Sequence, residues 1–162
     1  MTRTDAAHTR PAWRRVASWA RRSLYRIATP IDRIVHWNNR TLLPPAHLRI
    51  YYYRTWDPAA FIRASAGART ELTTRGLRPE HRVLDIGSGI GNLALGLVDY
   101  LRGGYDGIEI HQGAVEWCQR EITTRYPTFR FHRADLTSGA YNPSGRTPAS
   151  QYRFPFKDHS FD

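Results

Sequence analysis

Ten residues, 82–91, constrain the fold of this chain more than any other stretch. They read RVLDIGSGIG: a short apolar run, an aspartate, and three glycines at alternate positions. The apolar run predicts a buried strand, and the following GNLALGLVDYLR predicts a helix. Because glycine has no side chain, glycines in this turn let the backbone approach a ligand closely. A tight turn with close helix–strand packing needs the same glycines, so that explanation stays open at this point.

Strands and helices alternate after this turn. YDGIEI (105–110) and FRFHRADL (129–136) predict two more strands, and GAVEWCQREITTRY (113–126) predicts the helix between them. Short connections between such elements favour a parallel sheet with right-handed crossovers. We therefore predict an α/β fold: a Rossmann-like parallel sheet with helices on both faces, in its N-terminal half only. Inside the second helix we expect Val115, Cys118 and Ile122 to face inward.

Upstream of the first strand, an α-helical extension is expected. Apolar residues recur at steps of three and four from Pro11 to the neighbourhood of Pro30, with arginines largely elsewhere on the helical wheel. Residues 41–56 are expected to form an irregular aromatic connector. Asp57 followed by proline predicts the start of a second helix that runs to Gly76.

The charge of +10 is unevenly spread. Residues 1–56 carry eleven arginines against two aspartates, whereas residues 57–162 carry thirteen basic and twelve acidic side chains. We divide the chain accordingly into a basic, largely helical extension (1–56) and the N-terminal part of a cofactor-binding domain (57–162). Because the second part is nearly neutral, a nucleic-acid partner is not expected for it.

The arginines and tryptophans of residues 10–29 suit peripheral contact with an anionic membrane surface. A lid over the active site, an oligomer contact and a solvated face remain open alternatives for this helix. The sequence has neither an apolar run of eighteen residues nor a secretory signal. Its single cysteine, Cys118, rules out an intramolecular disulfide and a cysteine-only metal site. We expect a cytoplasmic protein, which lies at the membrane surface if the helix of residues 10–29 binds there. We expect no bound metal ion.

Three parallel strands do not complete a doubly wound sheet. The first strand normally pairs on its far side with a fourth, and without that partner its apolar edge is exposed. The stretch that follows the third strand is rich in glycine, proline and serine and ends at Asp162. We expect the chain to stop just before the fourth strand.

The ligand class follows from charge. A pyrophosphate group prefers the N-terminus of the helix after the turn. Asp85 places a carboxylate near this helix terminus, where its charge would repel a pyrophosphate. The carboxylate suits a cation that carries an ammonium and a sulfonium group. The spacing Gly-x-Gly-x-Gly is also tighter than the dinucleotide fingerprint. Both features favour S-adenosyl-L-methionine over NAD.

Acidic residues also end the other two predicted strands. Glu109 can accept hydrogen bonds from two neighbouring ribose hydroxyls, and Ile110 can lie against adenine. Asp135 can accept a hydrogen bond from the adenine amino group, with Leu136 beside it. Each position has a plainer explanation as a solvated charge or a core side chain.

The segments VLDIGSGIG, YDGIEI, FHRADL and YRFPFKDHSFD resemble the successive motifs of class I S-adenosylmethionine-dependent methyltransferases, over residues 57–162. The resemblance implies that Asp85, Gly87 and Gly89 line the methionine end, Glu109 the ribose, and Ile110 and Asp135 the adenine. It implies methyl transfer to a small-molecule, sugar or lipid-linked acceptor, with this chain carrying the cofactor-binding half. The predicted cofactor-binding residues are Asp85, Gly87, Ser88, Gly89, Gly91, Glu109, Ile110, Asp135 and Leu136.

No catalytic residue is assigned. A general base is needed only for a hydroxyl or a protonated nitrogen acceptor, and His111, His132 and His159 are candidates by type alone. Cys118 is expected to be a packing residue. Two other functions remain open: a non-catalytic adaptor that binds membrane or nucleic acid through the arginine-rich helix, and NAD-dependent oxidoreduction.

Overall fold

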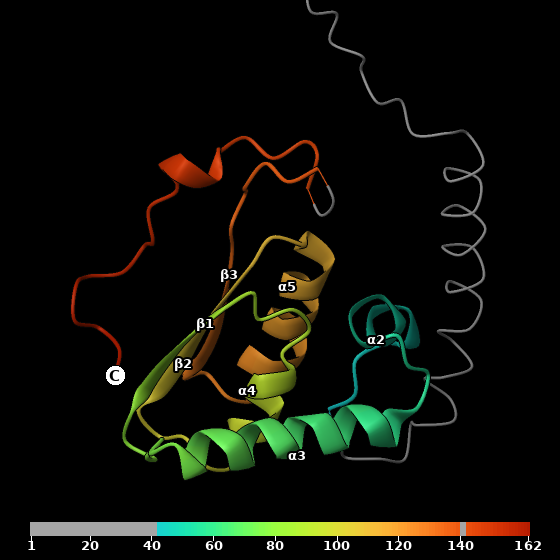
Figure 1. Ribbon diagram of the computed structural model, residues 1–162, viewed down its shortest axis with the longest axis vertical. Coiled ribbons are helices and arrows are strands. Elements are labelled where there is room, and N and C mark those ends of the chain that lie inside the picture. Colours follow the sequence, from blue (N-terminus) through green and yellow to red (C-terminus); the bar gives the residue numbers. More distant parts are fainter. Residues whose placement is uncertain (1–41, 140–141) are drawn as a thin grey trace, which may run out of the picture.

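The computed structural model describes residues 42–139 and 142–162, so the helix expected within residues 1–41 lies outside the described part. Its centre is a three-stranded parallel sheet in the order β1 (Arg82–Ile86), β2 (Gly104–Glu109), β3 (Phe129–Arg133) (Figure 1). Because the strands are parallel, their carboxyl ends meet at one edge of the sheet. The prediction of an α/β fold with a parallel sheet is confirmed, as a partial Rossmann-like fold.

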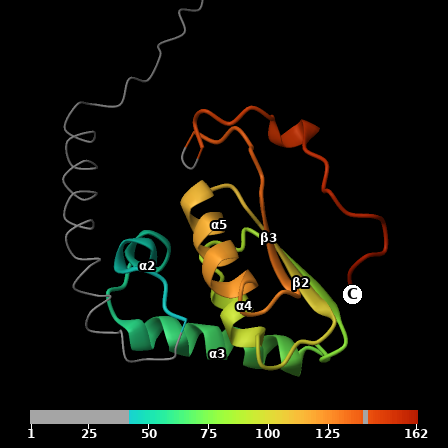
Figure 2. The same cartoon turned by 180° about the vertical axis from the view of Figure 1, so that it is seen from behind.

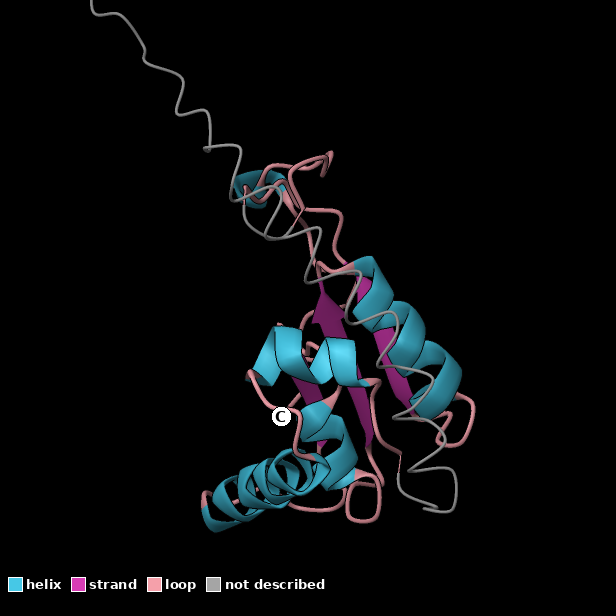
Figure 3. Ribbon diagram, turned by 90° about the vertical axis from the view of Figure 1, so that its right-hand side faces the viewer, coloured by secondary structure: helices cyan, strands magenta, loops and turns pink. Residues whose placement is uncertain are grey.

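The helices follow the alternation predicted from the sequence. α3 (Pro58–Thr74) precedes β1, α4 (Asn92–Leu97) follows the glycine turn, and α5 (Gln112–Cys118) connects β2 to β3 through a π-helical turn, Gln119–Thr123. Figure 3 shows α5 packed along the strands. A short 3-10 helix, Ala149–Gln151, is the last regular element.

Two predicted helices are shorter than expected. α4 ends at Leu97, where the chain enters a turn that reaches Tyr100. The predicted 113–126 helix leaves α geometry after Cys118 and finishes as the π-helical turn. There the Thr123 hydroxyl donates a hydrogen bond to the Phe129 carbonyl (2.7 Å), which ties the turn to β3.

The prediction that residues 41–56 form an irregular connector was wrong in part, because a helix, α2 (Ala46–Tyr53), lies within them. A buried side chain, that of Arg49, connects the two ends of this helix to its flanking segments. Arg49 is fully buried and donates to the backbone carbonyls of Pro44 (2.5 Å) and Trp56 (3.1 Å), on either side of the helix. Figure 2 shows α2 beside α5.

The start of α3 was predicted correctly. Asp57 is the N-cap, and its carboxylate accepts hydrogen bonds from the backbone N–H groups of Ala59 (2.8 Å) and Ala60 (3.1 Å). These bonds satisfy two of the amides that a helix leaves free at its first turn. Pro58 fills the first helical position, where no N–H is needed.

Side chains of the sheet alternate between two faces. The helix-side face includes Tyr105 and Phe129, whose rings stack at 5.3 Å, together with Phe131. α5 and its π-helical turn pack Cys118 and Ile122 into this core, where both are fully buried. The inward orientation predicted for Val115, Cys118 and Ile122 is confirmed, as is the packing role of Cys118.

The opposite face of the sheet is built around a buried acid. Asp106, whose side chain is 1% exposed, pairs with Arg82 (3.1 Å), Arg130 (3.2 Å) and His132 (2.8 Å). The C-terminal segment, residues 152–162, covers these residues. The Phe156 ring contacts the His132 ring, and the Phe161 ring packs against the Arg82 guanidinium. Figure 1 shows this segment, in red, on the side of the sheet away from α5.

The C-terminal segment ends beside β1. Asp162 donates its backbone N–H to the Arg82 carbonyl (3.1 Å), and its carboxylate accepts the Arg82 N–H (2.8 Å). The other end of β1 is open, and Ile86 is 65% exposed.

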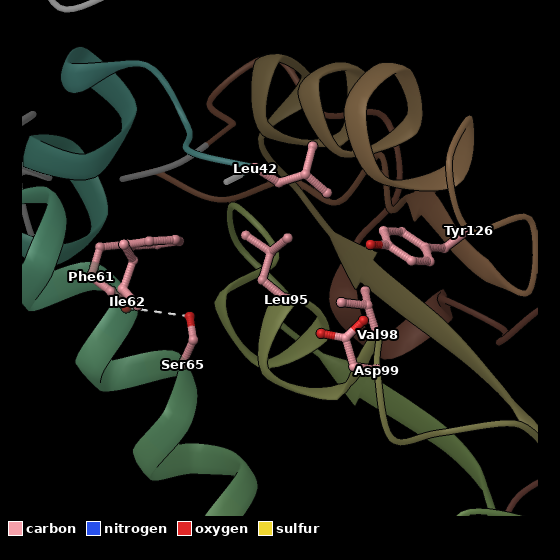
Figure 4. Close-up of a pocket in the computed structure, with 8 residues that line it drawn as sticks. All are labelled: Leu42, Phe61, Ile62, Ser65, Leu95, Val98, Asp99 and Tyr126. Atoms are coloured by element: carbon pink, nitrogen blue, oxygen red, sulfur yellow. Dashed lines mark hydrogen bonds between the residues drawn. The ribbon is translucent and has the colours of Figure 1, made fainter. Parts of the chain in front are cut away.

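A hollow of about 190 Å³ lies between α3 and α4 (Figure 4). None of the predicted site residues lines it. Its lining comprises Leu42, Phe61, Ile62, Ser65, Leu95, Val98, Asp99 and Tyr126.

Within residues 42–139 and 142–162, no helix has the length and apolarity needed to cross a bilayer. The same residues hold no group of three or more histidine, cysteine, aspartate or glutamate side chains suited to a metal ion.

Candidate cofactor-binding site

The glycine turn adopts a backbone conformation that favours glycine. Gly87, Gly89 and Gly91 have φ angles of 85°, 53° and 72°, in the left-handed region that side chains disfavour. The turn is anchored on the neighbouring strand, because the N–H groups of Gly87 (2.8 Å) and Ser88 (3.0 Å) both donate to the Ile108 carbonyl. The turn therefore lies over the carboxyl end of β2.

The three glycines differ in what surrounds them. A Cβ atom on Gly91 would meet the Ile122 side chain at 2.7 Å, and one on Gly89 would meet the Tyr52 ring at 3.1 Å. At Gly87 nothing lies within 4 Å of that position. Packing within the protein thus accounts for Gly91 and for much of Gly89. Gly87 is the glycine whose bare backbone faces open space and is accessible to a ligand.

A fourth glycine, Gly107, allows the turn to sit where it does. It lies in the middle of β2, and a Cβ atom there would come within 2.8 Å of the Ser88 side chain and 2.9 Å of Phe131. Gly107 is not among the site residues predicted from the sequence. The signal was present, because a glycine inside a strand often marks a close approach of another segment.

Asp85 faces the helix side of the sheet and accepts a hydrogen bond from the buried Tyr105 hydroxyl. Burial raises the pKa of Asp85; the hydrogen bond from Tyr105 opposes the rise, and the nearby Glu109 charge adds to it. No arginine or lysine among the described residues forms a salt bridge with Asp85.

Glu109 lies on the same face, at the end of β2, and is 9% exposed. Its carboxylate accepts three backbone N–H groups, from Gly89 (2.9 Å), Ile110 (2.7 Å) and His111 (2.8 Å). A carboxylate has about four acceptor positions, so capacity for a further donor remains. In the described part of the chain this charge also has no salt-bridge partner.

The turn contributes one further polar group, Ser88. Its hydroxyl is buried and has no hydrogen-bond partner among the described residues. Ile110, predicted to lie against adenine, is half-buried beside Glu109. The structure thus brings together six of the predicted residues at the carboxyl ends of β1 and β2: Asp85, Gly87, Ser88, Gly89, Glu109 and Ile110.

Asp135, predicted to accept the adenine amino group, is held by the loop that follows it. Its carboxylate accepts hydrogen bonds from Arg146 (2.7 Å), Asn142 (3.0 Å) and Arg133 (3.3 Å). Beside it, Leu136 forms a parallel bridge with Thr147. An adenine amino group would share the Asp135 carboxylate with these donors.

The three candidate histidines occupy different places. His111 caps α5 and its Nδ1 accepts the Ala114 N–H (3.2 Å), so the neutral ring carries its proton on Nε2. His132 bonds to Asp106 on the opposite face of the sheet from Asp85. His159 is exposed in the C-terminal segment, with a φ of 56°. None is assigned a catalytic role.

The residues that sequence analysis missed are the tyrosines of α2, because 41–56 was taken as a connector. Tyr51 packs on the His111 ring (5.4 Å), Tyr52 on the Gly89 turn, and Tyr53 on Phe61 (5.3 Å). Burial and the nearby Asp85 charge raise the pKa of Tyr53 to about 12. α2 therefore covers the glycine turn next to both carboxylates.

The fold and this site define the class of protein: an α/β chain with part of a Rossmann-like sheet and a glycine turn at its carboxyl edge. No family model matches the chain. Over part of its length it is structurally similar to the YcgJ protein from Bacillus subtilis, at 30% identity and a TM-score of 0.38; the match covers 44% of this chain and 30% of that one. It is also similar to YjhP from E. coli, at 22% identity and a TM-score of 0.39, over 54% of this chain and 35% of that one. The matches thus span about a third of the length of those two proteins.

Proposed function

We propose that this chain forms the cofactor-binding part of an S-adenosyl-L-methionine-dependent methyltransferase. One observation carries the proposal. Asp85 and Glu109 lie on the same face of the sheet, beside an open glycine backbone, and neither is paired with an arginine or lysine of the described residues. Two carboxylates in such a place repel an anionic pyrophosphate and favour a cationic ligand.

The residues fit an adenosyl cofactor in three ways. Asp85 offers a carboxylate for an ammonium group, and Glu109 retains an acceptor position for a ribose hydroxyl. Ser88 lies in the turn between these groups, and its buried hydroxyl is directed toward Gly107 of β2. Gly87 gives a ligand access to the backbone. In the proposed site Gly89, Ile110, Asp135 and Leu136 complete the lining, and Gly91 ends the turn as the N-cap of α4.

When bound, the cofactor supplies an electrophilic methyl group, so the protein needs to bind, orient and exclude water. Orientation of the reacting groups contributes roughly 7 to 11 kcal/mol to such a reaction. The residues described here hold one reactant. The acceptor is proposed to be a small molecule, a sugar or a lipid-linked group.

Titration calorimetry of the full chain with S-adenosyl-L-methionine, S-adenosylhomocysteine and NADH tests the proposal. We expect saturable binding of the first two and none of NADH. Asp85→Asn removes a charge at the site, and Asp158→Asn removes one from an exposed position as the matched control. The first is expected to weaken S-adenosyl-L-methionine binding at least tenfold and the second less than twofold. Binding of NADH alone, or equal effects of the two variants, contradicts the proposal.

Residues 10–29 lie outside the described part of the chain, and we propose that they make the peripheral membrane contact. Co-sedimentation with anionic vesicles tests this separately. Replacing Arg14, Arg15, Arg21 and Arg22 with glutamine is expected to abolish it. Unchanged sedimentation of that variant contradicts the membrane proposal and leaves the cofactor site untouched.

A further inference from the structure

Three consecutive tyrosines on α2 point in three directions, because each residue of an α-helix turns by about 100°. Tyr51 reaches the His111 ring and Tyr53 reaches Phe61. Tyr52 alone is directed at the glycine turn, where its ring carbons Cδ1 and Cε1 each lie 3.1 Å from the position that a Cβ atom on Gly89 would take. A side chain from a separate helix thus forms one wall of the site.

The hydroxyl of Tyr52 is buried and makes no hydrogen bond of ordinary geometry with any described residue. The nearby Glu109 carboxylate already accepts three backbone N–H groups. Burial first, and then the Glu109 charge, raise the pKa of Tyr52 well above its usual value. The phenol therefore keeps its proton at neutral pH and is a hydrogen-bond donor.

A buried donor without a partner costs free energy, because it gives up its bonds to water. Such groups are few in native proteins, and a role at a functional site is one of the reasons for which they are kept. At Tyr52 the cost is not relieved by movement of the helix, because Arg49 fixes α2 through the carbonyls of Pro44 and Trp56. The hydroxyl is thus pre-positioned beside Glu109.

We propose that Tyr52 is a ligand-binding residue: its hydroxyl donates a hydrogen bond to the ribose of the adenosyl ligand held by Glu109, and α2 forms the cover of this end of the site. The inference rests on the proposed function. The ribose, rather than the amino-acid end, is assigned because Tyr52 contacts Gly89 and Glu109, whereas its neighbour Tyr53 lies toward Asp85.

The test is calorimetry of the full chain and its Tyr52→Phe variant with two ligands. S-adenosylhomocysteine carries both the ribose and the amino-acid end, whereas 5′-methylthioadenosine lacks the amino acid. We expect the variant to bind both ligands about five- to tenfold more weakly, the effect of one hydrogen bond. Tyr126→Phe removes a hydroxyl near the amino end of β3, and this control is expected to change neither affinity by more than twofold.

A second readout uses the protein without ligand. If the Tyr52 hydroxyl serves only the ligand, Tyr52→Phe leaves the unfolding temperature unchanged or raises it, since the ring packing on Gly89 is kept. A clear fall in that temperature shows a structural role and overturns the inference. Weaker binding of S-adenosylhomocysteine alone overturns the ribose assignment. Equal affinities of variant and wild type overturn the role of Tyr52, whereas a wild type that binds neither ligand overturns the proposed function itself.

Discussion

Two acids three positions apart on β2, Asp106 and Glu109, are buried on opposite faces of one sheet. Asp106 is surrounded by Arg82, Arg130 and His132. Glu109 is held by backbone N–H groups alone and shares its face with a second acid, Asp85. The sheet therefore carries a neutralised carboxylate on one face and, on the other face, an unneutralised pair made by Asp85 of β1 and Glu109 of β2.

On the proposed function, the difference is one between a structural charge, Asp106, and charges that are kept for a ligand. A buried carboxylate with cationic partners stabilises the sheet as long as the partners remain. A carboxylate held by neutral donors keeps its net charge, and a second one nearby adds repulsion. Proteins keep such arrangements where function needs them, at some cost in stability. Substitutions on the two faces should therefore change stability in opposite directions.

The largest effect is expected from Asp106→Asn. The substitution removes the charge that Arg82, Arg130 and His132 share, and we expect the free energy of unfolding to fall by about 3 kcal/mol. Urea denaturation followed by circular dichroism measures this. A loss below about 0.5 kcal/mol, within the range of an ordinary surface substitution, would mean that the two faces do not differ as described.

Gly107→Ala is expected to cost about 2 kcal/mol, because the added methyl group meets Ser88 and Phe131 and pushes the glycine turn off β2. The same denaturation experiment measures it. Gly67→Ala, in the middle of α3 where nothing lies within 4 Å, is the matched control. It is expected to raise stability by roughly 0.5 to 1 kcal/mol, as alanine does in helix interiors. A destabilised control with an unaffected Gly107 variant would contradict the packing account.

The dependence of the unfolding free energy on pH, in the acid range, gives a further test of the comparison between the two faces of the sheet. Burial works to raise the pKa of Asp106, but the hydrogen bonds with His132, Arg130 and Arg82 and the charge of Arg130 outweigh it and lower that pKa below its ordinary value. A lowered pKa means stability that is present above the ordinary carboxyl value and is lost as the pH falls through the folded-state value. Unfolding between pH 5 and pH 2 should therefore be steeper in the wild type than in Asp106→Asn. Equal pH dependence of the unfolding free energy in the wild type and in Asp106→Asn would contradict the stabilising role of the Asp106 charge.

The smallest effect, of opposite sign, is expected from Asp85→Asn. Burial raises the pKa of Asp85, so its contribution to stability is present at low pH and lost as the pH rises through the folded-state value. At pH 7 the neutral amide should raise the unfolding free energy by about 0.5 to 1 kcal/mol. Thermal unfolding at pH 7 and pH 4 checks this, with a gain at the higher pH only. A loss at pH 7 would place Asp85 with Asp106 among the structural charges.

Local sequence patterns predicted much of this molecule. The strand–turn–helix order, the Asp57 cap and the inward face of α5 each depend on neighbours within a few residues. The parallel order of strands also predicted that the acids at 85 and 109 end at one edge. These features are governed by side-chain periodicity and backbone geometry, which a sequence displays directly.

The parts that escaped prediction depend on contacts between distant residues. α2 is fixed by buried Arg49, and Tyr52 meets Gly89 across 37 positions of sequence. Asp135 is taken up by Arg146 from the following loop, which no periodicity announces. Gly107 is the exception, because a glycine inside the YDGIEI strand was a visible sign of close approach.

The structure of the full chain with S-adenosylhomocysteine bound tests the central claim most directly. The account predicts the amino group of the ligand at Asp85, the ribose hydroxyls at Glu109, and the ligand backed by Gly87. A ligand bound away from the glycine turn, or a phosphate-containing nucleotide seated against Asp85 in its place, would contradict it.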